Sequence, residues 1–183
     1  MTALIRLADA CDAAAIAAIY RAYVEESHFT FEEVPPDADE IGSRMAGPIH
    51  PWIVVEEAGE VLGYASTAPM RNRAGYRWSV ETGIYLAPEA QGKGFGRNLL
   101  GTHLDLLTRQ GFVTAIAGIA LPNARSVALH DKMGFSLLGI ERAVGFKLGQ
   151  WVDVGRWQRD LTDRTQVAAE PLPYRVLAAR SLR

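Results

Sequence analysis

Residues 91–97 (QGKGFGR) combine three alternating glycines with two basic side chains, directly before a stretch with helical periodicity. Because glycine has no side chain, successive backbone amides in such a segment can turn toward one point. The first turn of a helix adds unpaired N–H groups and a partial positive charge. Lys93 and Arg97 would neutralise anionic oxygens at the edge of such a site. The segment therefore predicts a binding site for a diphosphate group.

Two other phosphate-binding motifs do not fit this segment. A P-loop requires G-x-x-x-x-G-K-[S/T], which occurs nowhere in the chain. A dinucleotide-binding fingerprint requires G-x-G-x-x-G after the first strand, but Arg97 stands where the third glycine would be, and the segment lies in the middle of the chain. The pattern that remains is Q-x-x-G-x-G between a strand and a helix.

Glu81 is the first candidate for acid–base chemistry. It lies in SVETGIYL, residues 79–86, which is expected to form the strand before the glycines. Apolar neighbours in that strand would desolvate its carboxylate and suit it to general-base work near neutral pH. The alternative that stays open on these residues alone is a glutamate on a solvated strand face.

Hydrophobic periodicity predicts the elements that must position these residues. In the opening helix, Ile16, Ile19, Tyr20, Tyr23 and Val24 form one apolar stripe. In chain order, we expect a strand near 4–7, a helix capped by Asp9, a short helix from Asp37, a hairpin over 52–67, a strand over 76–88, a helix over 94–110, a strand over 111–121, a helix over 123–134 and two strands over 136–161. The order predicts a mixed α/β domain.

The end of the chain differs in character from the rest. From about Thr162 it is polar and then irregular around Pro171 and Pro173. We therefore predict a domain over residues 1–161 and a C-terminal tail over residues 162–183. This tail would wrap either the surface of its own domain or a partner subunit.

Composition excludes several function classes. With 49% hydrophobic and 22% charged residues, the 183-residue chain can bury one ordinary core, and a formal net charge of −2 offers no basic surface for nucleic acid. Cys11, the single cysteine, can form no internal disulfide and no thiolate-based metal site. No segment reads as a signal peptide or a membrane span. We expect a cytoplasmic protein without a metal.

The chain resembles the GNAT superfamily of N-acetyltransferases. The resemblance rests on the Q-x-x-G-x-G segment after GIYLAPEA, followed one strand later by NARSVALHDKMGF. Within the superfamily it is similar to the phosphinothricin and methionine sulfoximine/sulfone acetyltransferases, through TFEEVPP, YRWSVETGIYL, IALPNARSVALHDKMGF and VGFKLGQWVDVGRWQRDL. These segments span residues 4–161. The resemblance implies a mostly antiparallel sheet, splayed open to hold acetyl-CoA, with helices on both faces.

The resemblance also implies roles for individual residues. Glu81 would be the general base, and a backbone N–H near Leu86 would meet the oxyanion. His130 stands where many superfamily members have a tyrosine; it would be a second base, a proton shuttle or a group that orients the substrate. Acetyl-CoA would contact Ile84, Tyr85, Leu86, Gln91, Gly92, Lys93, Gly94, Phe95, Gly96, Arg97, Asn123 and Ser126.

The acceptor implied by the resemblance is a small amino-acid-like molecule. A guanidinium fork from Arg71 or Arg73 suits a free carboxylate, although both could instead belong to a solvated loop. Phe29, Phe31, Tyr76 and Trp78 are possible pocket walls. Family membership further suggests a homodimer in which the segment around Phe146 and Lys147 approaches the partner's active site.

Two other functions are compatible with these motifs. The same fold could acetylate a protein N-terminus or a lysine side chain, which requires an open groove for a peptide. A CoA-binding regulator would keep the glycine segment but have no working base. The aromatic and arginine candidates favour a closed pocket over a groove, and retention of Glu81 and His130 favours catalysis over regulation.

Overall fold

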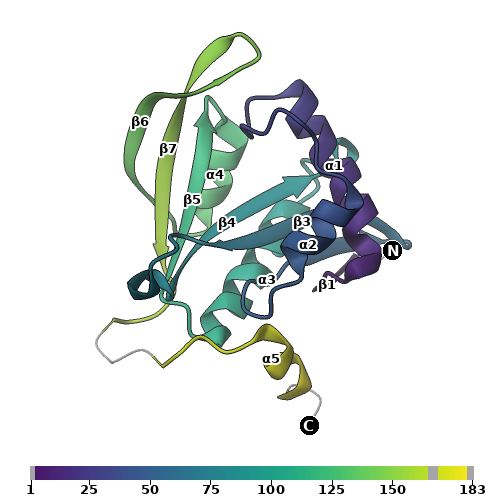
Figure 1. The fold of residues 1–183 in the computed structure, drawn as a ribbon, viewed down its shortest axis with the longest axis vertical. Coiled ribbons are helices and arrows are strands. Elements are labelled where there is room, and N and C mark those ends of the chain that lie inside the picture. The colour runs from purple at the N-terminus through teal and green to yellow at the C-terminus, as the bar shows by residue number, and fades with distance from the viewer. Residues whose placement is uncertain (1–2, 165–168, 181–183) are drawn as a thin grey trace.

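The fold is a single seven-stranded sheet with helices on both faces, seen in a computed structural model that describes residues 3–164 and 169–180 (Figure 1). The strands lie in the order β1-β2-β3-β4-β5-β7-β6, and only β4 and β5 pair in parallel. The elements are β1 Leu4–Leu7, α1 Ala13–Glu26, α2 Ala38–Met45, β2 Ile53–Glu57, β3 Glu60–Pro69, β4 Ser79–Leu86, α3 Phe95–Gln110, β5 Thr114–Leu121, α4 Ala124–Lys132, β6 Ser136–Lys147, β7 Gln150–Asp160 and α5 Tyr174–Arg180.

The predicted mixed, mostly antiparallel sheet is confirmed, with two differences at element ends. Asp9 caps a short 3-10 turn, Ala10–Asp12, that leads into α1. The strand expected over 76–88 begins only at Ser79, because Ala74–Tyr76 forms another 3-10 turn.

The helices bury two apolar clusters against the sheet. Between α1, α2 and the sheet, the first cluster contains Ile16, Ile41 and Tyr64. The second contains Leu100 and Trp157 and lies under α3 and α4. In Figure 1, α1 and α2 lie on one face of the sheet, over strands β1–β4, and α3 and α4 lie on the other face. On the face that carries α1, no described helix covers β5, β7 and β6.

The β4–β5 ladder is short, and this opens the sheet. Only residues 79–81 of β4 pair with residues 114–116 of β5, in a register that places Glu81 opposite Ile116. Past this point the two strands diverge. The hydroxyl of Thr82 donates to the carbonyl oxygen of Ile116 over 3.2 Å, so the carbonyl of the last β5 residue in the ladder has a partner.

The C-terminal tail folds back on its own domain. Backbone N–H groups of Leu172 and Tyr174 donate to the carbonyls of Gln110 and Pro48. The chain around Pro171 and Pro173 is irregular as expected, but residues 174–180 form a helix, α5, that the sequence did not predict. Tyr174 and Leu177 lie one helical turn apart and are both buried, so docking of an apolar face stabilises this short helix. The domain boundary at residue 161 stays a prediction.

His103 is a polar residue in the core on α3. It has no exposed surface, and its Nε2 lies 2.6 Å from the hydroxyl oxygen of Thr67. Burial lowers the pKa of His103 from 6.5 to about 4, because a charged imidazolium loses its hydration inside the protein. The folded state therefore holds this ring in its neutral form.

This burial predicts acid sensitivity. The pKa of His103 is lower in the folded state than in the unfolded state. The neutral ring therefore contributes its full share to the free energy of unfolding above pH 6.5, and this share is lost as the pH falls toward 4. Between pH 7 and pH 5, we expect the wild-type free energy of unfolding to fall by about 2 kcal/mol more than that of His103→Gln. Urea unfolding at the two pH values measures this difference, and equal losses in the two proteins would contradict it.

Candidate active site

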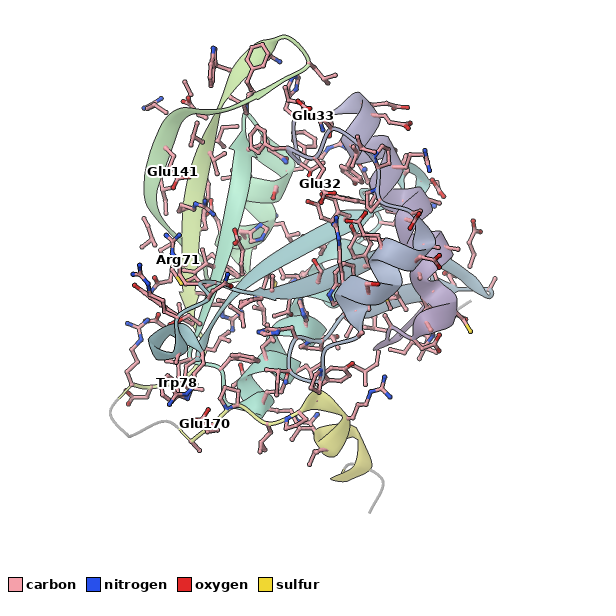
Figure 2. The ribbon with its side chains drawn as sticks, viewed as in Figure 1. Glu32, Glu33, Arg71, Trp78, Glu141 and Glu170 are labelled. Carbon is pink, nitrogen blue, oxygen red and sulfur yellow. The ribbon has the colours of Figure 1, made fainter. Side chains whose placement is uncertain are left out.

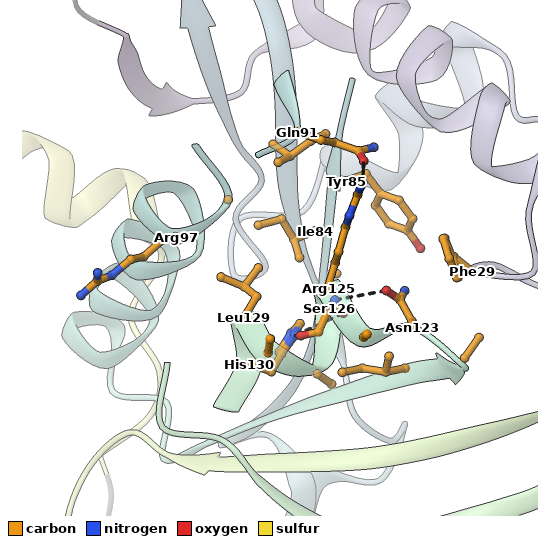
Figure 3. Close-up of a pocket in the computed structure, with 18 of the residues that line it drawn as sticks. Phe29, Ile84, Tyr85, Gln91, Arg97, Asn123, Arg125, Ser126, Leu129 and His130 are labelled. Carbon is orange, nitrogen blue, oxygen red and sulfur yellow. Dashed lines mark hydrogen bonds between the residues drawn. The ribbon is translucent and has the colours of Figure 1, made fainter. Parts of the chain in front are cut away.

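A cavity of about 930 Å³ lies where β4 and β5 diverge, and it brings together most of the predicted cofactor residues (Figure 3). Its walls come from β4, the glycine segment, β5 and α4. The predicted residues that line it are Phe29, Ile84, Tyr85, Leu86, Gln91, Gly92, Gly94, Gly96, Arg97, Asn123, Ser126 and His130. The predicted residues outside its lining are Phe31, Arg71, Arg73, Tyr76, Glu81, Lys93 and Phe95.

The glycine segment has the backbone conformation that its sequence predicts. Gly92 and Gly94 have φ values of 76° and 88°, in the left-handed region that side chains disfavour. A Cβ atom at either position would meet nothing within 4 Å, so backbone conformation, and not crowding, accounts for the glycines. Helix α3 begins directly afterwards, with Gly94 as an N-cap that has no side chain. The unpaired N–H groups of its first turn can therefore serve an anionic ligand.

Gln91 joins the two walls of the cavity. Its Oε1 accepts a hydrogen bond from Arg125 Nη1 of α4 over 2.8 Å, and its Nε2 donates to the Tyr23 hydroxyl over 3.1 Å. The Tyr23 hydroxyl in turn donates to the Leu86 carbonyl over 2.7 Å. Sequence analysis missed Tyr23 and Arg125, because Tyr23 fits the apolar stripe of α1 and Arg125 belongs to no local motif.

The Leu86 N–H, expected to face an oxyanion, is directed at the Tyr23 oxygen over 3.4 Å. Burial raises the pKa of Tyr23, so its hydroxyl keeps its proton at neutral pH and holds the end of β4 as a donor. An oxyanion at this position would compete with Tyr23 for the Leu86 N–H.

His130 is set into the cavity wall by helix α4. The Asn123 side chain accepts from Ser126 N–H over 3.1 Å and caps that helix. His130 is 3% exposed, and its Nδ1 lies 2.8 Å from the Ser126 carbonyl oxygen. A carbonyl only accepts, so Nδ1 carries the hydrogen and the neutral ring has an unprotonated Nε2. Burial lowers the pKa of His130, which favours that neutral form.

Glu81 lies on the opposite face of the sheet from His130. Ala117 packs in the cluster under α3 and α4, so Gly118, the next residue of β5, faces the other side. A Cβ at Gly118 would lie 3.3 Å from Glu81 Oε1, which places Glu81 on that side as well. The two candidate catalytic groups therefore flank the opening between the strands.

The prediction that apolar neighbours desolvate Glu81 was wrong. Its side chain is 42% exposed and forms an ion pair with Arg156 Nη1 over 2.9 Å. The physical reason is the pairing of β5 with β7, which brings Arg156 opposite Gly118, where no side chain separates it from Glu81. A contact between residues so distant in the chain leaves no local signal in the sequence.

The β6–β7 hairpin holds the loop that carries the two predicted pocket phenylalanines. Lys147 donates to the Thr30 carbonyl over 2.8 Å and is only 4% exposed. The ring of Phe31 lies so close to Gly145 that a Cβ there would be 2.1 Å from it. Lys147 therefore contacts a loop of its own chain, whereas Phe146 is 53% exposed. Phe29, on the same loop, lines the cavity.

The loop between β3 and β4 lies away from the cavity lining. Arg71, Arg73 and Tyr76 are exposed there. The Trp78 indole donates to the Ala169 carbonyl of the tail over 2.8 Å and stacks with a neighbouring guanidinium, so it is engaged with the tail and not with the expected pocket. Figure 2 shows Trp78 beside the tail.

Neither a metal cluster nor a membrane-spanning helix is found in the part of the chain that the structure describes. Within residues 3–164 and 169–180, no three His, Cys, Asp or Glu side chains are grouped so that they could hold a metal ion. None of the helices in those ranges is long and apolar enough to cross a membrane.

Comparison with known proteins identifies the family. Residues 5–155 match the family described as acetyltransferase (GNAT) domain. The chain belongs to the GNAT acetyltransferase family. The fold and the resemblance expected from the sequence are therefore confirmed, and the chain is an acetyltransferase.

This GNAT protein is similar to several relatives whose activity is named. It is 37% identical to a phosphinothricin N-acetyltransferase of Streptomyces viridochromogenes over 93% of this chain and 92% of the relative. It is also 37% identical to an L-methionine sulfoximine/L-methionine sulfone acetyltransferase of Salmonella typhimurium, over 87% and 95% of the two chains. The solved structure of a phosphinothricin acetyltransferase of Sinorhizobium meliloti, in complex with acetyl-CoA, is 41% identical and superposes with a TM-score of 0.88. The match covers 94% of this chain and 96% of that one.

The geometry of the glycine segment predicts the effect of one substitution. We expect Gly94→Val to weaken coenzyme A binding by about 10-fold or more, because a β-branched side chain is strained at this φ and would screen the amides that face the ligand. Isothermal calorimetry measures the affinity.

Gly59→Val is the matched control. Gly59 has a φ of 85° and open space around its missing Cβ, but it lies in the β2–β3 turn outside the cavity. This variant should carry similar backbone strain and keep normal affinity. Unchanged affinity in a folded Gly94→Val protein would show that the segment does not hold the diphosphate.

Proposed function

We propose that this GNAT protein transfers the acetyl group of acetyl-CoA to the amino group of a small amino-acid-like acceptor, of the phosphinothricin, methionine sulfoximine or methionine sulfone kind. The observation that carries the proposal is the opening between β4 and β5, with the glycine segment at one end and Glu81 and His130 on opposite faces. The names of the relatives support the acceptor class. We further propose that the protein is cytoplasmic and has a role in detoxification.

The cavity fits the proposed cosubstrate. The amides of residues 92–96 would bind the diphosphate, with Lys93 and Arg97 at its edge. Asn123, Ser126 and the residues of β4 after the ladder would line the path of the pantetheine arm. A thioester reaching the end of the ladder would then lie close to Glu81.

Amide formation sets the chemical requirements. An ammonium group must lose a proton before its nitrogen can attack the thioester carbonyl, and we assign that step to Glu81, directly or through one water. The amine nitrogen then attacks the carbonyl to form the C–N bond and a tetrahedral oxyanion. When this intermediate collapses, the C–S bond breaks and the departing thiolate takes up the second proton that the nitrogen gives up. The neutral His130, with Nε2 unprotonated, fits a second base or an orienting acceptor on the other face.

Acceptor selection is assigned to the loops around the opening. Phe29 lines the cavity, and Phe31 is fixed beside it by the hairpin. Arg71 or Arg73 would bind the acceptor carboxylate and Tyr76 would contact the acceptor, if binding of the acceptor brings the β3–β4 loop inward. All three side chains are exposed.

Release of coenzyme A thiol tests the proposal. With acetyl-CoA and methionine sulfone or phosphinothricin, we expect acceptor-dependent thiol release by the wild-type protein. Loss of a general base should lower turnover of Glu81→Gln by roughly 10²–10⁴-fold, with little change in acetyl-CoA affinity. Glu25→Gln, on the exposed face of α1, is the control and should keep full activity.

Other outcomes of the same assay would point elsewhere. Transfer to peptides but not to free amino acids would indicate a protein acetyltransferase. Binding of coenzyme A with no thiol release would indicate a regulator. Turnover of Glu81→Gln equal to that of the wild type up to alkaline pH would remove Glu81 from the mechanism.

We also propose that the protein is a homodimer joined through the β6–β7 hairpin. This hairpin exposes several large apolar side chains, a concentration that commonly marks a protein interface. They are Leu137, Leu138, Ile140, Val144, Phe146 and Trp151. β6 is also an edge strand.

Charge on this surface should separate the subunits. We expect the wild type to sediment as a dimer and Leu138→Asp/Trp151→Asp to sediment as a folded monomer, because charged groups cannot be buried without partners. Leu4→Asp places the same charge on an exposed residue of the opposite edge strand and should leave the dimer intact. A monomeric wild type would overturn the proposal.

A further inference from the structure

Arg156 links two carboxylates on the open face of the sheet. Its Nη1 lies 2.9 Å from Glu81 Oε1, and its Nε lies 3.2 Å from Glu141 Oε2. The three residues come from β7, β4 and β6. Each side chain is roughly 40% exposed, so an acceptor molecule can reach these three side chains.

The sheet register leaves room for this group. Arg156 pairs across β5–β7 with Gly118, two residues beyond Ile116, the partner of Glu81. A Cβ on Gly118 would lie 2.9 Å from Arg156 Nη1 and 3.3 Å from Glu81 Oε1. Even alanine at this position would therefore press on both members of the ion pair. Because Gly118 has no side chain, the guanidinium of Arg156 can pass over β5 and reach β4.

We propose that Arg156 is the positioning residue for the general base, and that Gly118 provides the space in which it works. This inference rests on the proposed function of Glu81. A single exposed ion pair would hold a carboxylate only weakly. Here the guanidinium is held from its other side by Glu141, so one oxygen of Glu81 is fixed and the other is left for the acceptor amine or its water.

Arg156 also sets the charge around Glu81. Within the described residues, the charged groups recorded against Glu81 are Arg156 directly and Glu141 through it. The neighbouring positions of β3 and β5 are Ala68 and Ile116, which are uncharged. Without Arg156, the Glu81 carboxylate would lose the ion pair that fixes one of its oxygens.

Separate measurement of kcat and KM tests this role, with acetyl-CoA and methionine sulfone as substrates. We expect Arg156→Met to lower kcat by about 10- to 100-fold, as expected for a displaced catalytic group. KM for methionine sulfone should change far less, because the loss falls on the chemical step and not on binding. Arg156→Lys should restore only part of kcat, because an ammonium cannot bridge both carboxylates in the same geometry.

Three further variants separate positioning from general stability. Gly118→Ala should reproduce the loss of kcat with Arg156 still present. Gly139→Ala is its control, since a Cβ there meets nothing within 4 Å. Arg21→Met removes an exposed Arg–Glu pair on α1 and should change neither kcat nor KM. KM for acetyl-CoA should stay within about twofold in the Arg156, Gly139 and Arg21 variants, because none of these residues lines the cavity.

The possible failures are distinguishable. If the wild type transfers no acetyl group to any amino acid, the proposed function fails and this inference fails with it. If the wild type is active but Arg156→Met keeps its kcat, the positioning role alone is overturned. A lower kcat with KM raised to the same extent, and no rescue by lysine, would show that Arg156 only supports the fold.

Discussion

The early end of the parallel β4–β5 ladder is the constraint on which the rest of the site depends. Up to Glu81 and Ile116 the strands share hydrogen bonds, and beyond them their facing backbone groups need other partners. The Thr82 hydroxyl pairs with the carbonyl of Ile116 at the end of the ladder. The backbone groups that follow border the cavity, where an extended ligand with amide groups could pair with them. The opening thus creates both the space and the hydrogen-bonding edge that a pantetheine arm requires.

The same opening divides the chemistry between two faces. His130 is buried under α4 with its ring held by a backbone carbonyl, whereas Glu81 lies half-exposed beside Arg156 on the face that no described helix covers over β5, β7 and β6. A thioester between the strands would meet its acceptor from the Glu81 side and release its thiol toward the other. The sheet itself therefore keeps these two candidate catalytic groups apart.

Loops around the opening are held by polar contacts made over long distances in sequence. Tyr23 of α1 holds the carbonyl of Leu86, and Lys147 of the hairpin holds the carbonyl of Thr30. Burial lowers the pKa of Lys147, although Glu32 and Glu33 act in the other direction. Each of these polar groups reaches a backbone acceptor, which offsets the cost of removing it from water.

Local sequence determined the parts of this protein that depend on local physics. The order of helices and strands follows from apolar periodicity, the Gly92–Gly94 turn from the need for positive φ, and the α4 cap from Asn123. The resemblance added the residues of the cavity wall. Only the tertiary structure decided the surroundings of Glu81, the link from Gln91 to Tyr23 and Arg125, and the helix in the tail. These depend on strand register and on side chains that meet across the fold, and neither leaves a periodic or local trace in the chain.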